Sequence, residues 1–311
     1  MPISKGLTYK KEAKPMKFLK KSKLSKNYDK FGWLFTIPSI VIIGSFVFYP
    51  MIQAFITSLK SGMGNNLRFV GIANYARLFT DNIFQKSVVN TLIYLVVQVP
   101  IMILLALFIS VLLNDKNLKW KAFFRTAIFL PCVTSLVAYS VIFKSLFSND
   151  GLMNKLLLNI HLINVPIEWI TSPFWAKLTI IIAITWRWTG YNMIFYLAGL
   201  QNIDPSIYEA AKIDGASGMK QFFYITVPLL KPIILFTTII STTGTLQLFD
   251  EVMNITKGGP GNASTTISQY IYNLSFKYSP NFGYAAAVSY TIVIMIVVLS
   301  LVQFKVAGDD K

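Results

Sequence analysis

Long apolar runs, separated by short polar connections, fill the chain between residues 32 and 304. A helix needs about 20 predominantly apolar residues to cross the hydrocarbon core of a bilayer. Six runs meet this requirement, and they cover residues 32–57, 91–113, 123–147, 176–200, 232–253 and 283–304. The pattern therefore predicts an all-α, polytopic membrane protein with six transmembrane helices.

The composition and the placement of charge agree with this prediction. Charged residues make up only 14% of the 311 residues, whereas a soluble domain carries about a quarter. The net charge of +16 would suit a nucleic-acid partner, but ten of the 29 basic residues lie in the first 30 positions. Basic segments beside a span are attracted to anionic lipid on the cytoplasmic face. We therefore expect residues 1–31 to be a cytoplasmic basic tail at a lipid membrane, with no nucleic-acid partner, and the first run to remain as an anchor.

Basic residues in the short connections predict the orientation of the spans. Connections 114–122 and 201–231 each contain three lysines, whereas the connection 148–175 contains one. The connection 58–90, with four basic residues, departs from this asymmetry. Counted together, the basic residues place the tail, the two lysine-rich connections and the C-terminal residues 305–311 in the cytoplasm.

The connection 201–231 has the sequence of a short helical hairpin. Asp204 can cap a helix and Pro205 suits its first position. Gly215 can end this helix because glycine readily adopts the left-handed conformation that follows many helices. A second amphipathic piece with Phe222 and Phe223 follows, and Pro228 and Pro232 then start the fifth span.

This connection also carries a family resemblance. The residues Glu209-Ala210-Ala211, with Gly215, Ile225 and Pro228 at the following positions, resemble the EAA loop of ABC importer permeases. The sequence from Tyr208 to Pro232 is similar to the version of this loop in the carbohydrate branch of the family, which includes maltose and glycerol-phosphate permeases. Val227 replaces the leucine that usually precedes the proline at position 228. Further matching pieces occur in the same order along the chain: Phe69-Val70-Gly71, Asn74-Tyr75, Asn90-Thr91, Leu197 to Gln201, Thr256 to Pro260 and Gly283 to Ala287.

The resemblance implies a type I ABC importer permease fold over residues 32–304, in a bacterial cytoplasmic membrane. It implies four kinds of partner: a second homologous permease, two ATP-binding cassette ATPase subunits, an extracytoplasmic sugar-binding protein and the lipid membrane. Residues 204–232 would be the coupling loop, which docks in a cleft of an ATPase. The coupling residues carried over from the family are Tyr208, Glu209, Ala210, Ala211, Asp214 and Gly215.

The sequence offers no catalytic apparatus of its own. It contains no G-x-x-x-x-G-K-[ST] run to bind phosphates, and His161 is its only histidine. Cys132 is its only cysteine and lies in an apolar run. We therefore expect a transport subunit and not an enzyme, with no metal or cofactor bound by this chain and with ATP and Mg²⁺ used by the partner ATPases.

Polar residues inside the spans are the candidates for a substrate path. Arg187 lies near the middle of the fourth span, and charged groups in spans are costly enough to be functional candidates. It would line the path, or instead form an inter-helix ion pair or contact the partner permease. In the fourth span, Trp188, Asn192 and Phe195 share a helical face, with Tyr191 adjacent.

The fifth span carries a matching set of polar residues. Thr243, Gln247 and Asp250 fall at helical spacing, with Ser241, Thr242 and Thr245 nearby. Serine and threonine in spans often join helices to one another, but the larger Gln247 and Asp250 side chains need water or several partners. An aromatic face opposite a Gln and Asp face would suit a sugar, which has apolar ring faces and many hydroxyls.

The predicted function is ATP-driven import of a sugar, and the family branch favours a di- or oligosaccharide. The same machinery carrying glycerol phosphate or another small polar solute is an alternative, since Arg187 could bind an anion. An ion-coupled secondary transporter would need carboxylates near the membrane midplane, often with internal repeats, and only Asp250 and Glu251 come close. A structural membrane protein without transport is the third alternative.

Overall fold

The computed structural model of the protein describes residues 23–62, 67–115 and 117–308, and helices account for most of them. The two strands among these residues, β1 and β2, pair antiparallel with Lys60 opposite Phe69. The elements, in chain order, are α1 (Lys23–Ile43), the π-helix η1 (Gly44–Phe48), α2 (Tyr49–Ser58), β1 (Lys60–Ser61), β2 (Arg68–Phe69), α3 (Ala73–Leu78), α4 (Asn82–Asn114), α5 (Lys121–Val133), α6 (Leu136–Leu146), α7 (Leu152–Asn159), α8 (Pro173–Gln201), α9 (Pro205–Ile213), α10 (Gly218–Gln221), the π-helix η2 (Phe222–Thr226), α11 (Val227–Leu246), the π-helix η3 (Val252–Thr256), α12 (Ile267–Tyr272), the π-helix η4 (Asn273–Lys277) and α13 (Phe282–Gly308).

The chain divides into two compact units after Gln53. Residues 1–22 of the predicted basic tail lie outside the described residues, and α1 already begins at Lys23. From Lys30 to Ser58 the helix is continuous and apolar enough to cross a membrane. Large apolar side chains such as Trp33, Phe35 and Phe46 are exposed along it, and exposure of this kind suits lipid or a protein partner.

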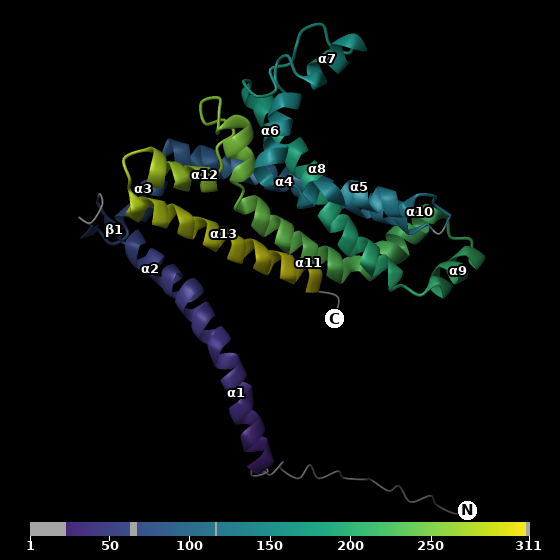
Figure 1. Ribbon diagram of the computed structural model, residues 1–311, viewed down its shortest axis with the longest axis horizontal. Coiled ribbons are helices and arrows are strands. Elements are labelled where there is room, and N and C mark those ends of the chain that lie inside the picture. Colours follow the sequence, from purple (N-terminus) through teal and green to yellow (C-terminus); the bar gives the residue numbers. More distant parts are fainter. Residues whose placement is uncertain (1–22, 63–66, 116, 309–311) are drawn as a thin grey trace, which may run out of the picture. The chain divides into compact units, whose positions relative to one another are not determined.

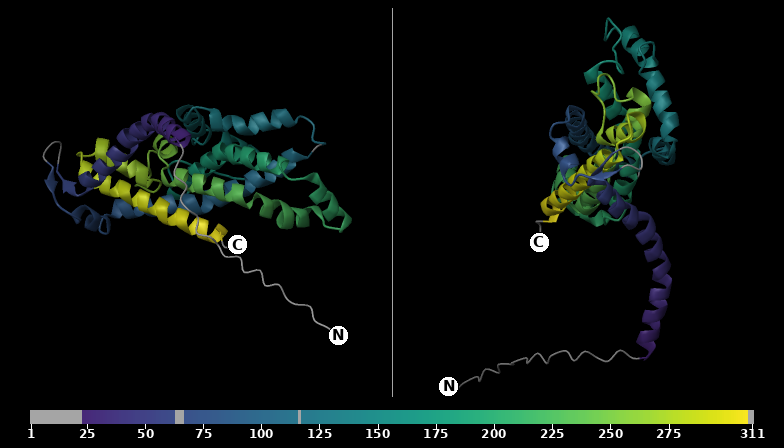
Figure 2. Two further views of the ribbon diagram at one scale, coloured as in Figure 1. Left: turned by 90° about the horizontal axis from the view of Figure 1, so that it is seen from below. Right: turned by 90° about the vertical axis from the view of Figure 1, so that its left-hand side faces the viewer.

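The second unit is built on four long helices, α4, α8, α11 and α13, which run alongside one another (Figures 1 and 2). One core joins α4, α8 and α11 through buried residues such as Ala106, Met193 and Leu230. A second core joins α12 and α13 to the start of α4 through Tyr270, Tyr284 and Val288. The helix α9 lies at the end of this unit opposite to α3 (Figure 1).

Length and composition identify four continuous membrane spans, or five when the bent pair α5 and α6 counts as one. The predicted number of six is therefore not confirmed on these criteria. The remaining predicted span corresponds to α8, whose 29 residues are about 44 Å long and sufficient to cross a bilayer. Its middle contains Arg187, Tyr191 and Asn192, which lower its hydropathy.

The prediction of one continuous helix over residues 123–147 is wrong. Helix α5 ends at Val133, α6 begins at Leu136, and the two are bent by 100°. Pro131 lies in the last turn of α5, and Thr134 takes an extended backbone conformation that ends the helix. With 13 residues, α5 is about 20 Å long, which is shorter than the hydrocarbon core.

The fifth predicted span also differs from the sequence interpretation. Its helix runs without interruption from Gly218 to Leu246 and includes the π turn at Phe222–Thr226. Pro228 and Pro232 therefore lie inside a helix that began earlier, and the π turn, in which the Val227 amide donates to the Phe222 carbonyl, comes directly before Pro228. At its other end the helix stops at Leu246, so it does not reach residue 253.

Glycine permits a close contact between α8 and α5 in the second unit. A Cβ atom at Gly190 of α8 would lie 2.1 Å from the backbone oxygen of Ile128 in α5. Because no side chain could fit there, Gly190 lets the two helix backbones approach directly. This contact holds α5 against the helix that carries the predicted aromatic and amide face.

A polar network at the start of α4 ties together three helices. The Asp81 carboxylate caps α4 by accepting hydrogen bonds from the amides of Ile83 (2.9 Å) and Phe84 (3.1 Å). It also accepts the hydroxyl hydrogens of Tyr270 in α12 (2.5 Å) and Tyr284 in α13 (2.7 Å). Burial raises the pKa of this carboxyl, but the four hydrogen bonds outweigh burial and leave the pKa below its usual value.

Candidate functional site

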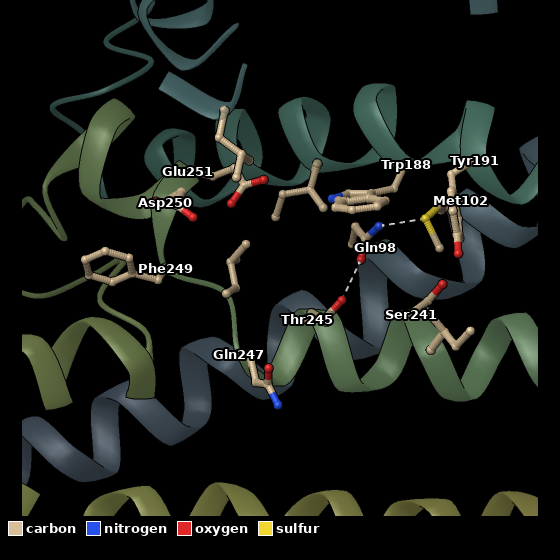
Figure 3. Close-up of a pocket in the computed structure, with 15 residues that line it drawn as sticks. Gln98, Met102, Trp188, Tyr191, Ser241, Thr245, Gln247, Phe249, Asp250 and Glu251 are labelled. Carbon is tan, nitrogen blue, oxygen red and sulfur yellow. Dashed lines mark hydrogen bonds between the residues drawn. The ribbon is translucent and has the colours of Figure 1, made fainter. Parts of the chain in front are cut away.

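A pocket of about 270 Å³ lies where α4, α8 and α11 meet the chain that follows α11 (Figure 3). This volume is at the lower limit for ligand pockets in proteins. The lining residues come from these elements and from α6: Gln98, Met102, Leu136, Ile184, Trp188, Tyr191, Ile240, Ser241, Gly244, Thr245, Gln247, Leu248, Phe249, Asp250 and Glu251.

A chain of side-chain contacts orders the α4 side of the pocket. Thr245 donates to Gln98 Oε1 at 3.2 Å, and Gln98 Nε2 donates to the sulfur of Met102 at 3.2 Å. Gln98 and Thr245 are both buried. The amide of Gln98 is therefore fixed in orientation with its polar edge at the pocket.

The end of α11 turns acidic residues toward this pocket. The chain leaves the helix after Leu246, and residues 247–249 are not helical. The break allows Gln247, Asp250 and Glu251 to line the pocket together. Figure 3 shows the Asp250 and Glu251 side chains at one end of the pocket, with Trp188 and Tyr191 toward the other end.

The prediction that Thr243, Gln247 and Asp250 share one helix face is wrong, because α11 ends before Gln247. Gln247 and Asp250 nevertheless line the pocket, whereas Thr243 does not. Thr243 donates its hydroxyl to the Ile239 carbonyl of its own helix at 2.9 Å.

The predicted residues of α8 separate into two groups. Trp188 and Tyr191 line the pocket, with ring centroids 5.7 Å apart. Asn192 is buried between helices instead, where it donates to the Trp188 carbonyl at 3.0 Å and contacts Met102 and Ser241. Phe195 lies outside the lining and packs between Tyr191 and Phe236.

Arg187 is buried behind the pocket wall and is not one of its lining residues. Its Nη2 atom donates to the Cys132 carbonyl at 3.3 Å, and its guanidinium lies 4.7 Å from the Tyr139 ring centroid and 5.6 Å from that of Trp188. It also interacts electrostatically with Glu251. These contacts join α8 to α5 and α6 and place Arg187 outside the pocket lining, without an ion pair to a carboxylate among the described contacts.

Several pocket residues were not among the sequence candidates, and two of them come from an unexpected helix. Gln98 and Met102 come from α4, a helix in which no substrate residue was predicted. Gln98 is a polar residue within a predicted span, two positions before Pro100, and this was the signal that could have found it. Met102 carries no such signal.

Residues 204–232, the predicted coupling loop, form the expected hairpin of two helices. Asp204 caps α9 by accepting the Ser206 amide at 2.9 Å, and this hydrogen bond lowers the pKa of its carboxyl. Gly215 has φ +75°, as predicted for the residue that ends the helix. The Tyr208 and Thr226 hydroxyls are 3.0 Å apart and tie α9 to the start of the following helix.

The outer surface of this hairpin is open. Glu209, Ala210 and Asp214 are exposed, and Ala211 is half-buried. Ile213 is 87% exposed and Tyr224 is 81% exposed. The hairpin therefore presents apolar as well as charged side chains on its surface.

No group of three or more His, Cys, Asp or Glu side chains suited to a metal ion occurs in the described part of the chain. Cys132 lies in α5 as a free thiol. His161 lies just after α7 in the left-handed conformation, with φ 57°.

Comparison with known proteins places this geometry in context. The family model described as binding-protein-dependent transport system inner membrane component matches residues 70–306. The Lactose transport system permease protein LacF of Rhizobium radiobacter is 57% identical over 293 residues, covering 94% of this chain and 98% of the relative. The Arabinooligosaccharides transport system permease protein AraP of Bacillus subtilis is 35% identical, covering 90% of this chain and 89% of the relative.

Solved structures show the same fold. A bacterial ABC transporter involved in the import of the acidic polysaccharide alginate has a chain with a TM-score of 0.80 and 22% identity, covering 93% of this chain and all of that one. A bacterial alginate ABC transporter in complex with an alginate pentasaccharide-bound periplasmic protein gives a TM-score of 0.79 at 23% identity, covering 91% of this chain and 96% of that one.

Proposed function

Since this chain belongs to the binding-protein-dependent transport system inner membrane component family, we propose that it is a permease subunit of an ABC importer for di- or oligosaccharides. Its role is transport and not catalysis. Relatives that it matches over nearly their whole length are named for lactose, arabinooligosaccharides and trehalose or maltose. The relative with 57% identity makes a lactose-type disaccharide the first substrate to test.

One observation carries the proposal: the helices that line the pocket are the helices that the coupling loop joins. Helix α8 supplies Trp188 and Tyr191, and α11 supplies Ser241 and Thr245. The α9–α10 hairpin connects the two helices, and α8 and α11 pack on each other in one core. A displacement of the hairpin would therefore move two walls of the pocket together, as alternating access requires.

We infer that the sugar passes through this pocket. Trp188 and Tyr191 offer aromatic faces to the apolar side of a sugar ring. Gln98, Ser241, Thr245, Gln247 and Asp250 offer hydrogen-bonding groups to its hydroxyls. Since the pocket is small for a disaccharide, a second homologous permease would complete the path. Arg187, Asn192, Phe195 and Thr243 would then support the pocket from behind.

We infer that the exposed face of the hairpin docks on one of two ATP-binding cassette ATPases, which use ATP and Mg²⁺. Glu209 supplies the polar contact, while Ala210 and Ala211 permit close packing and Gly215 turns the chain. The connection after α4 lies at the same end of the second unit as α9 (Figure 1), and both are lysine-rich. Positive-inside counting supports a cytoplasmic location for this end and for both termini. An extracytoplasmic sugar-binding protein would deliver substrate at the opposite end.

The test is lactose uptake into proteoliposomes that contain the complete set of subunits. We expect uptake to require ATP on the side of the membrane that the hairpin faces, which for uptake is the vesicle lumen. Glu209→Lys should abolish uptake, because it reverses the charge of the polar contact and places a bulkier side chain in the docking cleft. Glu168→Lys, a matched charge reversal in the connection before α8, should leave uptake intact. Uptake without ATP that follows an ion gradient would refute the proposal, and so would normal coupled uptake by Glu209→Lys.

A further inference from the structure

The charge of the pocket is one-sided. Among the residues that the structure describes, its lining contains two carboxylates, Asp250 and Glu251, and no lysine, arginine or histidine. Glu251 is only 4% exposed, although it lines the pocket. Acidic groups this deep in a membrane protein are costly and need a compensating role or partner.

Arg187 is a cation behind the pocket wall, and it cannot reach a substrate in this pocket. It is 5% exposed, lies outside the lining, and is covered by the rings of Tyr139 and Trp188. Its Nη2 atom is engaged by the Cys132 carbonyl. Arg187 therefore offers no free positive charge to a ligand in the pocket.

Polar groups behind Glu251 remain buried without hydrogen-bond partners. They are Nε and Nη1 of Arg187. Buried donors of this kind are costly unless a ligand, water or rearrangement supplies acceptors. Arg187 lies outside the lining, so a sugar in the pocket does not supply these acceptors.

The fold itself sets no rule on substrate charge. The structurally similar transporter is described as importing an acidic polysaccharide, so permeases of this shape can carry anions. Any selection by charge must therefore lie in the side chains of each pocket.

We propose that Asp250 and Glu251 make this pocket selective for uncharged sugars and exclude sugars that carry a carboxylate or a phosphate. The proposal rests on the proposed function, because it assumes that the sugar passes through the pocket. Hydroxyls of a neutral sugar donate to both carboxylates, and hydrogen bonds to charged acceptors are the stronger kind. An anionic group meets Asp250 with no accessible cation, in surroundings of low dielectric where an unpaired charge is strongly disfavoured. Glycerol phosphate is thereby excluded as a substrate of this site.

The experiment measures equilibrium binding to the assembled transporter in nanodiscs, without the external binding protein, by isothermal titration calorimetry. The probes are lactose, lactobionamide and lactobionate, of which the last two share one shape and differ in charge. We expect lactobionamide to bind at least about tenfold more tightly than lactobionate. The carboxylate of lactobionate can donate no hydrogen bond to Asp250 and meets no counterion in the pocket. In the double variant D250N/E251Q the ratio should fall toward one, mainly through tighter binding of lactobionate. Glu168→Gln removes one negative charge outside the pocket and should leave the ratio as in the wild type.

If the double variant does not fold, Asp250→Asn alone tests the same point, because this side chain is only half-buried. It should reduce the ratio by at least about threefold. Equal binding of the two probes by the wild type, or an unchanged ratio in the folded variants, would overturn the inference. Trp188→Ala separates the assignment of the pocket from the inference about charge. If this variant weakens lactose binding while the wild type binds the charged and uncharged probes equally, the pocket assignment holds and the inference about charge fails. If lactose does not bind, or binds normally to Trp188→Ala, the pocket assignment and the inference both fail.

Discussion

Replacing Asp81 by alanine would remove the acceptor on which two tyrosine hydroxyls and two backbone amides converge. The tyrosines belong to α12 and α13, and the amides belong to the first turn of α4. Arg77 adds a further contact, since its guanidinium lies 4.1 Å from the centroid of the Tyr284 ring. One half-buried carboxylate therefore holds three helices in register at the end of the unit opposite to α9.

The expected loss of stability follows from the separate contacts. Losing an N-cap costs about 1 kcal/mol. Each tyrosine hydroxyl left without its charged acceptor costs about 1–2 kcal/mol, toward the lower end because the site is half-buried. The total for Asp81→Ala is about 3–5 kcal/mol, or roughly a 10 °C decrease in melting temperature for a unit of this size. Asp81→Asn keeps the cap and one acceptor, so its cost should be about 1–2 kcal/mol.

The pH dependence has a definite sign. The folded protein holds the pKa of Asp81 below its usual value, so the unfolded chain binds this proton more readily. The stabilisation is present above the unfolded pKa, about 3.9, and is lost as pH falls below that value through the folded pKa. The difference in melting temperature between the wild type and Asp81→Asn should be constant between about pH 5 and 8 and should shrink as the pH falls below about 4.

The assay is thermal unfolding of the detergent-solubilised protein, followed by the amount that remains monodisperse after heating. Tyr270→Phe and Tyr284→Phe are the matched controls, since each removes one hydroxyl and leaves the rings in place. A double-mutant cycle of Asp81→Asn with each tyrosine variant should give coupling of about 1 kcal/mol or more. Additive effects, or an alanine variant as stable as the wild type, would refute the view that this carboxylate joins the three helices.

Three further predictions concern other contacts. Gly190→Ala should destabilise the protein by about 1–3 kcal/mol, because its Cβ atom would collide with the Ile128 carbonyl, a backbone group. Gly199→Ala should cost less, because its Cβ atom meets only the side chains of Ile233 and Leu230. Equal melting temperatures of the two variants would contradict this prediction. Asn90→Ala should cost about 2–4 kcal/mol of stability, because the amide donates to the Asn262 and Thr265 carbonyls at 3.1 and 3.0 Å. The lower melting temperature should be accompanied by easier proteolysis within residues 256–266. Unchanged protection of these residues from proteolysis would contradict the prediction. Tyr208→Phe should loosen the hairpin by removing its 3.0 Å contact with Thr226, and should reduce sugar-stimulated ATPase activity severalfold at normal expression, an effect that Tyr224→Phe on the exposed surface should not reproduce.

Much of the fold could be predicted because apolar runs, caps and turn residues act locally. The long helices, the cap at Asp204 and the turn at Gly215 all follow from residues within one or two helical turns. The break between α5 and α6 could not be predicted in this way, because a run of apolar residues has the same hydropathy whether it is straight or bent. Pro131 is compatible with a straight helix and with a bent one. The contact between Gly190 and α5 accompanies the bent form, and it joins residues too far apart in the sequence to be predicted from the local pattern.

The pocket was partly predictable for a similar reason. Trp188, Tyr191, Gln247 and Asp250 were found because polar and aromatic residues are conspicuous in apolar runs. Their arrangement was not found, since it depends on α11 ending at Leu246, and no glycine or proline lies between Leu246 and Thr256 to mark that end. The burial of Arg187 depends on Tyr139, which follows the bend between α5 and α6, and sequence spacing does not contain that relation.

The bend between α5 and α6 has one more consequence, and it concerns the backbone. A helix that stops inside a membrane leaves its last carbonyl groups without intrahelical donors, where no bulk water replaces them. The aligned peptide dipoles also place a partial negative charge at that end. Arg187 donates to the carbonyl of Cys132, in the last turn of α5, and brings a full positive charge to the same place. Arg187 of α8 therefore acts as a C-terminal cap of α5. The unpaired carbonyls of the interrupted helix explain why a buried positive charge is stabilising at this position.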